Sequence, residues 1–318
     1  MCFAIVVCLM LQCAETMKTV VEIKHLAKSY GSLQAVKDIS FDVVEGEIFG
    51  ILGPNGAGKT TIVECLQGLR HYDGGTARVL GFDPNSESAA LRHHIGSQLQ
   101  ESALPDRLKV WEALDLFASL SPVKADLNEL MRQWGLTEKR KASFGNLSGG
   151  QRQRLFVALS LVNSPKLVFL DEMTTGLDPA ARHVAWELIK AIRENGATVM
   201  LVTHSMEEAE ALCDRLAIVD HGSVVALDTP RGLINCYAGE VKVIFTSEIA
   251  DLGWLKAIDC VTSVDHNGPR VTVSGKGAVL ALVAASLVEH GIVPVDLHLE
   301  QPSLEDVFLK ITGHIAHD

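Results

Sequence analysis

Long hydrophobic runs are scarce in this sequence of 318 residues, and the one that lies near a terminus, residues 2–13, is short. It cannot cross a bilayer as a helix, because a span needs about 20 apolar residues. It also lacks the basic leader of a secretory signal. We therefore expect residues 1–17 to be a tail or a wrongly assigned start, with Met17 as the natural beginning and a short membrane anchor as the alternative. Any transmembrane task then falls to a partner chain.

Paired cysteines and metal-binding cysteine spacings are also missing. The chain has seven cysteines, an odd number, and none of them forms a CxxC pair. This pattern argues against a disulfide framework and against a cysteine-ligated zinc site. It is typical of free thiols in a reducing compartment such as the cytosol.

Basic residues are outnumbered, with 28 Lys and Arg against 39 Asp and Glu, which gives a formal net charge of −11. A large nucleic-acid footprint needs a basic face that neutralises phosphates. We therefore expect no nucleic-acid partner, although a local basic patch stays open. The length allows two domains and a sizeable core.

A glycine-rich segment follows the apolar run 47–52 and precedes a helix predicted over residues 60–69. Its glycines allow successive backbone N–H groups to turn inward, and the helix start adds positive partial charge. A lysine can reach the outer phosphates of a nucleoside triphosphate, and the next hydroxyl can ligand Mg2+. The segment therefore predicts a cradle for phosphates, formed by Gly53, Pro54, Asn55, Gly56, Ala57, Gly58, Lys59, Thr60 and Thr61.

Two carboxylates follow a second apolar run, residues 167–170. A continuous apolar run predicts a parallel strand buried on both faces, which delivers the acids at its carboxyl end, where open α/β sheets bind ligands. Asp171 is then placed to hold Mg2+, and Glu172 to orient or deprotonate an attacking water. The alternative is the start of a surface helix. A later predicted strand, residues 198–203, ends at His204.

A second anion cradle is predicted at Ser148, Gly149 and Gly150, where a helix over residues 152–162 begins. One triphosphate rarely needs two cradles from one chain. The simplest resolution is a head-to-tail pair of chains, in which each donates its serine and glycine amides to the nucleotide held by the other's Lys59. A surface turn with a capping serine is the alternative.

Strand and helix patterns alternate through residues 18–235, which predicts an α/β P-loop core with a parallel sheet. Alternating apolar and polar residues over 20–49 predict an antiparallel β subdomain. Helices over 109–117 and 125–134 form an inserted helical subdomain at about 101–145, and another helix runs over 179–195.

Residues 236–318 predict a small accessory α+β domain without a catalytic constellation. We expect strands over 241–245, 261–265, 271–274 and 293–299 and a helix over 278–289. Ser303 and Asp306 have the spacing of a capping box at the start of a last helix.

Together these motifs resemble those of an ATP-binding cassette (ABC) ATPase. Walker A is Gly53 to Thr60, the signature is Leu147 to Gln151, and Walker B is Leu167 to Asp171, followed by Glu172. Further matches are Gln100 in the Q-loop, residues 176–178 in the D-loop, His204 as the switch histidine and Tyr30 at the adenine-stacking position. The ending, residues 302–313, resembles the C-terminal extension of drug-resistance-type ABC exporter ATPases.

The resemblance implies a nucleotide-binding subunit that works with ATP and Mg2+ on the cytoplasmic face of the cell membrane and drives a separately encoded transmembrane permease. It implies a homodimer or heterodimer around two ATP molecules. In the family, Ser148 and Gly150 act on the partner's nucleotide, Gln100 senses the metal and the attacking water, and His204 holds the γ-phosphate.

One departure is visible, because Met173 stands where the family usually has proline after the Walker B glutamate. Proline would fix φ and stiffen this turn. We expect hydrolysis to survive at an altered rate.

Two alternatives remain within the resemblance, a soluble ABC ATPase that acts on ribosomes or DNA and a degenerate cassette that only binds ATP. The single cassette, the acidic balance and the retained Lys59, Asp171, Glu172 and His204 favour the transporter subunit.

Overall fold

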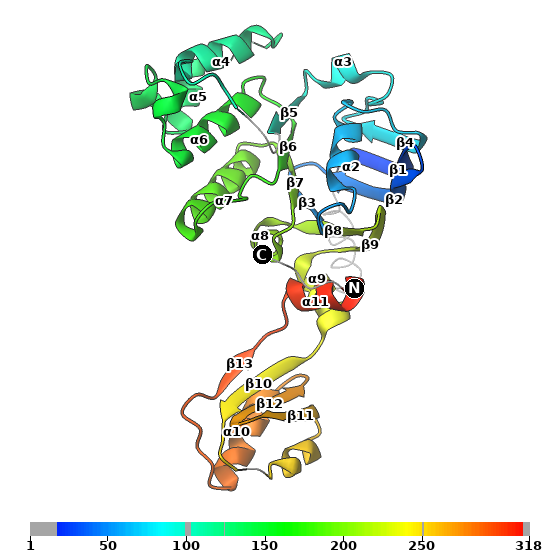
Figure 1. Ribbon diagram of the computed structural model, residues 1–318, viewed down its shortest axis with the longest axis vertical. Coiled ribbons are helices and arrows are strands. Elements are labelled where there is room, and N and C mark those ends of the chain that lie inside the picture. Colours follow the sequence, from blue (N-terminus) through cyan, green and yellow to red (C-terminus); the bar gives the residue numbers. More distant parts are fainter. Residues whose placement is uncertain (1–17, 99–102, 124, 250, 314–318) are drawn as a thin grey trace, which may run out of the picture. The chain divides into compact units, whose positions relative to one another are not determined.

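The computed structural model describes residues 18–98, 103–123, 125–249 and 251–313 (Figure 1). The predicted tail and Gln100 lie outside these ranges. The chain divides into two compact units, the first ending at Thr229 and the second starting at Pro230, whereas the sequence expectation placed the boundary at residue 235. Within the described ranges no helix has both the length and the apolar character of a membrane span.

The first unit is built on a nine-stranded sheet with the order β4-β1-β2-β9-β8-β3-β7-β6-β5. Its strands are β1 Thr19–Tyr30, β2 Leu33–Val44, β3 Ile48–Leu52, β4 Gly74–Val79, β5 Ile95–Gln98, β6 Leu167–Asp171, β7 Thr198–Thr203, β8 Arg215–Asp220 and β9 Ser223–Asp228. β1, β2 and β4 pair antiparallel, while β3 pairs parallel with β7 and β8, and β6 with β5 and β7. The predicted antiparallel subdomain and parallel core are confirmed, and a parallel bridge from Asp38 to Ser223 joins them into one sheet.

The central strands β3, β6 and β7 are buried along their whole length. This burial explains their continuous apolar sequence, because parallel strands are covered on both faces. The helix α2, Lys59–Leu66, adds Ile62, Val63 and Leu66 to the core. It was predicted to reach Leu69, but Gly68 adopts a left-handed φ of 68°, which ends the helix.

The helices that follow include the predicted inserted group. The bounds are α3 Ser88–Leu91, α4 Val110–Ser119, α5 Leu127–Gln133, η1 Thr137–Lys139, η2 Phe144–Asn146, α6 Gly149–Ser160, α7 Pro179–Glu194 and α8 Met206–Leu212. Figure 1 shows α4, α5 and α6 gathered beside the end of the sheet that carries β5 and β6. The predicted helices at 109–117, 125–134 and 179–195 are therefore confirmed to within about two residues.

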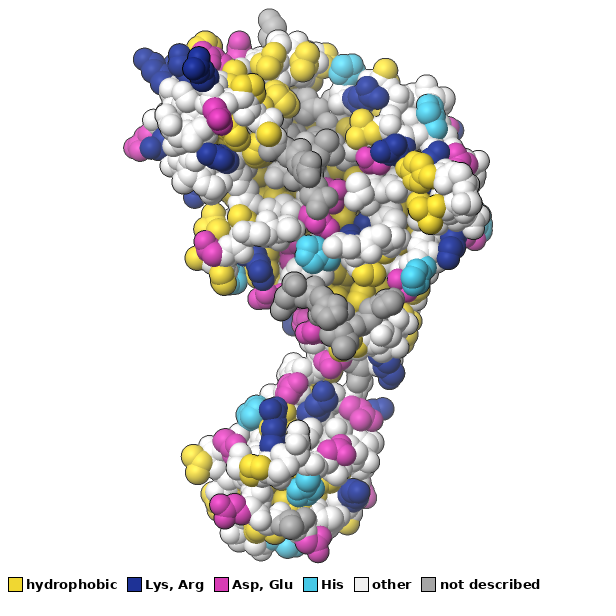
Figure 2. Space-filling model, in the orientation of Figure 1, with side chains coloured by type: hydrophobic (Ala, Val, Ile, Leu, Met, Phe, Trp, Pro, Cys, Tyr) yellow, Lys and Arg dark blue, Asp and Glu magenta, His cyan; other side chains and the backbone are white. Residues whose placement is uncertain are grey.

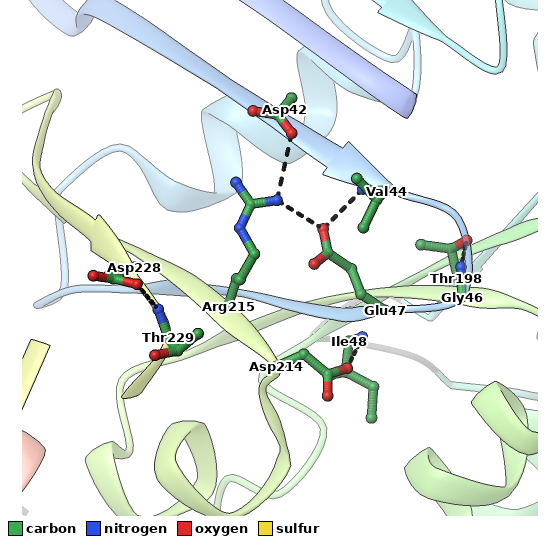
Figure 3. A network of polar contacts seen from close by, with 10 residues as sticks. All are labelled: Asp42, Val44, Gly46, Glu47, Ile48, Thr198, Asp214, Arg215, Asp228 and Thr229. Carbon is green, nitrogen blue, oxygen red and sulfur yellow. Dashed lines mark hydrogen bonds and ion pairs between the residues drawn. The ribbon is translucent and has the colours of Figure 1, made fainter. Parts of the chain in front are cut away.

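A polar network fixes the start of β3, at the end opposite its glycine loop (Figure 3). Arg215 of β8 contacts both Asp42 of β2 and Glu47 at 3.4 Å. The Glu47 carboxylate accepts a hydrogen bond from Val44 N, and Asp214 accepts one from Ile48 N. Burial raises the pKa of Glu47, while the Val44 N–H and Arg215 counteract this shift. These contacts tie the antiparallel strands to the parallel core.

The second unit is a four-stranded antiparallel sheet with the order β11-β12-β10-β13. Its elements are α9 Pro230–Leu233, η3 Ile234–Ala238, β10 Val241–Thr246, η4 Gly253–Ala257, β11 Val261–Asn267, β12 Arg270–Gly275, α10 Val279–Glu289, β13 His298–Glu300 and α11 Leu304–Thr312. The strands β10 and β12 and the helix α10 bury an apolar core. The predicted capping box is confirmed, because Ser303 caps α11 and Asp306 bonds back to Ser303 N.

The predicted strand over residues 293–299 is wrong over residues 293–297, since β13 covers only His298–Glu300. Pro294 has no N–H for a sheet ladder. Val293 and Val295 are also 75% and 103% exposed. Apolar sequence without a surface to cover does not form a strand here.

The described cysteines Cys65, Cys213, Cys236 and Cys260 are free thiols, as the sequence predicts. Burial raises the pKa of the Cys65 thiol to about 11, so it stays protonated near neutral pH.

Candidate functional site

The predicted phosphate cradle is a glycine turn between β3 and the start of α2. Gly58 is the residue before the helix and has φ of 101°, and a Cβ there would lie 2.4 Å from Ala35 O. A Cβ at Gly53 would lie 2.2 Å from Val219 O. Asn55, Gly56 and Thr60 are exposed, while Ala57 is buried and Pro54 and Thr61 are half-buried. The turn therefore presents the N-terminus of a helix to solvent, where an anion can bind.

Lys59 folds back over this turn and is only 5% exposed. Its Nζ donates hydrogen bonds to Gly53 O at 2.8 Å and to Pro54 O at 3.1 Å. It also lies 3.9 Å from Glu172 Oε1. Burial lowers the pKa of Lys59, while Glu172 and Asp171 oppose that shift. The amine is thus held at the cradle by carbonyl groups and nearby acids.

Asp171 is the last residue of β6 and is 3% exposed. Burial and then the neighbouring Glu172 raise its pKa to about 6, although Lys59 and a hydrogen bond from the Thr60 hydroxyl partly offset them. Its Oδ1 atom is buried without a hydrogen-bond partner. An unsatisfied carboxylate oxygen beside a hydroxyl is an oxygen donor set of the kind that Mg2+ prefers. The residues present therefore fit a magnesium ion.

Glu172 lies just beyond the strand, with its carboxylate between the Lys59 amine and the His204 ring. Its Oε1 atom lies 3.9 Å from Lys59 Nζ and 3.3 Å from His204 Nδ1, the latter at ion-pair distance without hydrogen-bond geometry. His204 directly follows β7, which pairs parallel with β6. Three neighbouring strands thus bring Lys59, Asp171, Glu172 and His204 together at their carboxyl ends. The predicted position of the two acids, at the end of a buried parallel strand, is confirmed.

The signature residues lie elsewhere, at the N-terminus of α6. Ser148 caps this helix, accepting from Gln151 N at 3.4 Å, while Gln151 Oε1 accepts from Ser148 N at 3.1 Å. Gly149 and Gly150 form its first turn. Figure 1 shows α6 well apart from α2. No hydrogen bond or ion pair between described residues joins Ser148, Gly149, Gly150 or Gln151 to the glycine turn, so one chain does not unite the two predicted cradles.

Tyr30 ends β1 and is 40% exposed. Lys28 Nζ and Arg70 Cζ lie 5.5 and 5.6 Å from its ring centroid, as cation–π contacts. The ring is accessible, and its predicted stacking on adenine stays a prediction. Gln100 lies outside the described residues, but β5 ends at Gln98, which pairs with Leu170 of β6. Gln98, two residues before Gln100 in the sequence, therefore lies beside the strand of Asp171.

One buried polar side chain near this site was missed by the sequence reasoning. Gln153 of α6 is 7% exposed, and its Nε2 atom donates a 2.9 Å hydrogen bond to Met173 O, one residue after Glu172. The signal was available, since Gln153 shares a helical face with Val157, which is buried. A polar residue on an apolar helix face calls for a partner.

Comparison with known proteins places this geometry in a family. A family model described as ABC transporter matches residues 36–175. A daunorubicin resistance ATP-binding protein of Streptomyces coeruleorubidus is 36% identical over 306 residues, covering 92% of this chain and 95% of that protein. The Nod factor export ATP-binding protein I of Rhizobium sp. (strain N33) is 38% identical over 305 residues, covering 93% and 98%.

Solved structures agree with these relatives. The ATP-binding subunit of an ABC transporter superposes with a TM-score of 0.61 and 26% identity, covering 69% of this chain and 93% of that one. A dimeric ATP-binding cassette in a post-hydrolysis state with ADP and Pi gives a TM-score of 0.59 and 26% identity, covering 66% and 98%. The chain belongs to the ATP-binding subunits of ABC transporters, which bind and hydrolyse ATP.

Proposed function

We propose that this chain powers export through a separately encoded transmembrane permease, working at the cytoplasmic face of the cell membrane. The observation that carries the proposal is the cluster of Lys59, Asp171, Glu172 and His204 around an open phosphate turn. Relatives named for drug resistance and for Nod factor export align over more than nine-tenths of the chain, including its second unit. They support export as the direction of transport.

Each residue at the turn has a proposed task. The N–H groups of the turn and Lys59 bind the outer phosphates, for which Lys59 exchanges its bonds to Gly53 O and Pro54 O. Thr60, Asp171 and Gln100 would hold Mg2+, which neutralises charge on the transferring phosphoryl group when bound. Glu172 orients the attacking water and accepts its proton, and His204 donates to the γ-phosphate.

We further propose that two chains, identical or different, clasp the nucleotides head to tail. The support is the separation between α6 and the glycine turn within one chain. Ser148, Gly149, Gly150 and Gln151 cap a helix whose N-terminus is exposed and favours anions. In a head-to-tail pair, this terminus faces the partner's triphosphate.

A groove of about 330 Å3 supports a docking place for the permease. It is lined by residues that follow α2 and α3, by β5 and by the ends of α4 and α6, including Leu69, Arg92, Phe117 and Leu120. Leu69 and Leu120 are 50% and 72% exposed. The groove includes Ile95, Gly96 and Ser97 of β5, so a permease element seated there would contact the strand next to β6, which carries Asp171.

The surface charges of the protein do not favour the alternative function, in which the chain acts on ribosomes or DNA. On the face drawn in Figure 2, Lys and Arg side chains are interspersed with Asp and Glu. The net charge of −11 also opposes phosphate-backbone binding. Co-purification with membranes only when a permease is co-expressed would support the transporter assignment, and co-sedimentation with ribosomes would contradict it.

The substitution Glu172→Gln tests the proposed mechanism. It keeps the shape of the side chain but removes the base, so we expect kcat to fall at least about a hundredfold, or 2.7 kcal/mol, while ATP still binds. With ATP and Mg2+, light scattering should show an accumulated dimer. The control is Glu187→Gln, an exposed glutamate of α7. Near-normal turnover, or single copies under these conditions, would refute the assignment.

A further inference from the structure

We propose that Gln153 is a positioning residue for Glu172 and that it connects the signature helix to the acid of its own nucleotide site. The inference rests on the role proposed above for Glu172. Its basis is the buried hydrogen bond from Gln153 Nε2 to Met173 O, 2.9 Å long, between α6 and the turn after β6.

The backbone at Glu172 needs support. Its φ of 47° lies in the left-handed region, which is unfavourable for a residue other than glycine. Such conformations persist only where the surroundings fix them. Glu172 N donates to Val202 O at 2.9 Å, and Thr175 N donates to Glu172 O at 3.2 Å. These bonds hold the two ends of the turn.

The middle of the turn is held by a side chain. Met173 is 6% exposed and Gln153 is 7% exposed, so water does not replace their hydrogen bond. A buried carbonyl left without a donor is destabilising, because it has lost its hydrogen bonds to water and gained none in the protein. Losing the amide would therefore make the present orientation of the Met173 peptide unfavourable. Because this peptide directly follows Glu172, the carboxylate would lose its fixed direction.

The hydrogen bond from Gln153 to Met173 O matters for the conformation of the turn because residue 173 is not proline. A proline ring would restrict φ at this position by covalent geometry, and proline is favoured at the second position of a turn of this kind. Met173 has no such restriction. The Gln153 amide thus supplies from outside the turn a restraint that the turn's own sequence lacks.

The same bond joins two functional segments. Gln153 lies in the second turn of α6, whose capping residue is Ser148. A displacement of this helix by a nucleotide at Ser148 would act directly on the Met173 carbonyl. Gln153 thus connects the surface offered to one nucleotide with the acid that acts on the other.

Steady-state hydrolysis by the full chain tests the inference. Gln153→Met keeps the length of the side chain but has no donor, and Gln153→Glu keeps the shape but cannot donate when ionised. We expect kcat to fall about tenfold in both variants, since tenfold corresponds to 1.36 kcal/mol, with KM for ATP within about twofold.

The matched control is Ser160→Ala in the same helix. It removes a buried hydrogen bond, from Ser160 Oγ to Val157 O at 2.7 Å, without touching the turn. We expect its kcat to stay within about twofold of the wild-type value after normalisation to folded protein. A fall in kcat in Gln153→Met and Gln153→Glu, but not in Ser160→Ala, supports the proposal that Gln153 positions Glu172.

Two results would overturn the inference. One is a Gln153→Met variant with the same kcat as the active wild-type chain. The other is a fall in kcat that is as large in Ser160→Ala as in the Gln153 variants and that follows the fall in melting temperature in each case. An inactive wild-type chain is a different observation, which would contradict the proposed function itself.

Discussion

The two units of this chain differ in what they bury. In the described part of the second unit, no polar or charged side chain is buried, and its core is aliphatic apart from Phe245 of β10 and Phe308 of α11. In the first unit the buried polar set is Glu47, Lys59, Gln67, Gln153, Ser160, Asp171, Thr174, Thr198, Thr203 and Glu208. Burying such groups is costly unless partners satisfy them.

The units differ in backbone strain in the same way. Non-glycine residues with positive φ, among those described, are His25, Leu80, Ser164, Glu172 and His221, all before Thr229. Strain and buried charge both coincide at Glu172 and its neighbours, where ATP chemistry is proposed. The first unit therefore has a lower folding stability than it could have, because its candidate nucleotide site needs buried charges and a strained backbone. The second unit buries only apolar side chains.

Phe245→Ala would give the largest effect and would test whether the units are energetically separate. Phe245 is fully buried in the core of the second unit, so truncation should cost that unit about 3–5 kcal/mol in its free energy of unfolding. Calorimetry should show a lowered transition while kcat stays unchanged. Val295→Ala, at a fully exposed residue, is the control. A parallel fall in kcat would break the comparison.

Asp171→Asn should sharpen the comparison between the two units, because we expect it to stabilise the nucleotide-free chain. Because the folded-state pKa is raised from 3.8 to about 6, the folded state binds more protons between these values. The contribution of this carboxyl to stability therefore falls as pH rises through that window, by at most about 3 kcal/mol.

In EDTA, the variant should melt above the wild-type chain at pH 7 and match it near pH 4. The exposed Asp115 provides the control substitution, Asp115→Asn. Equal melting temperatures at pH 7 would show that the buried Asp171 carboxylate is not a source of instability.

Lys59→Ala should weaken ATP binding about a hundredfold, or 2.7 kcal/mol, because it removes the one buried cation at the glycine turn. Calorimetric titration measures the change, with Lys190→Ala on the exposed face of α7 as the control. An unchanged affinity for ATP would show that Lys59 and the glycine turn do not bind the phosphates.

Met173→Pro should have the smallest effect. The ring restricts the turn behind Glu172, so we expect kcat to rise a few fold, less than about 1 kcal/mol, with KM unchanged. Gln153→Met should then cost less in this background than in the wild-type chain. An undiminished effect of Gln153→Met would show that the two restraints act on different parts of the turn.

Much of the site could be predicted from local sequence. The glycine turn, the strand before Asp171 and the helix start at Ser148 are set by residues close together in the chain, and all appear where expected. Two boundaries could not be predicted in the same way. The end of α2 depends on the left-handed Gly68, and residues 293–297 form no strand because nothing covers Val293 and Val295.

The sequence by itself determined which chemical groups are available and on which local elements they lie, because propensities and periodicity act over a few residues. Only the tertiary structure decided that Lys59 and His204 each lie within 4 Å of Glu172 and that Glu172 takes a left-handed φ. It also decided that Gln153 supports Met173 O. Strand order, burial and contacts between distant segments produce these features, and no local pattern encodes them.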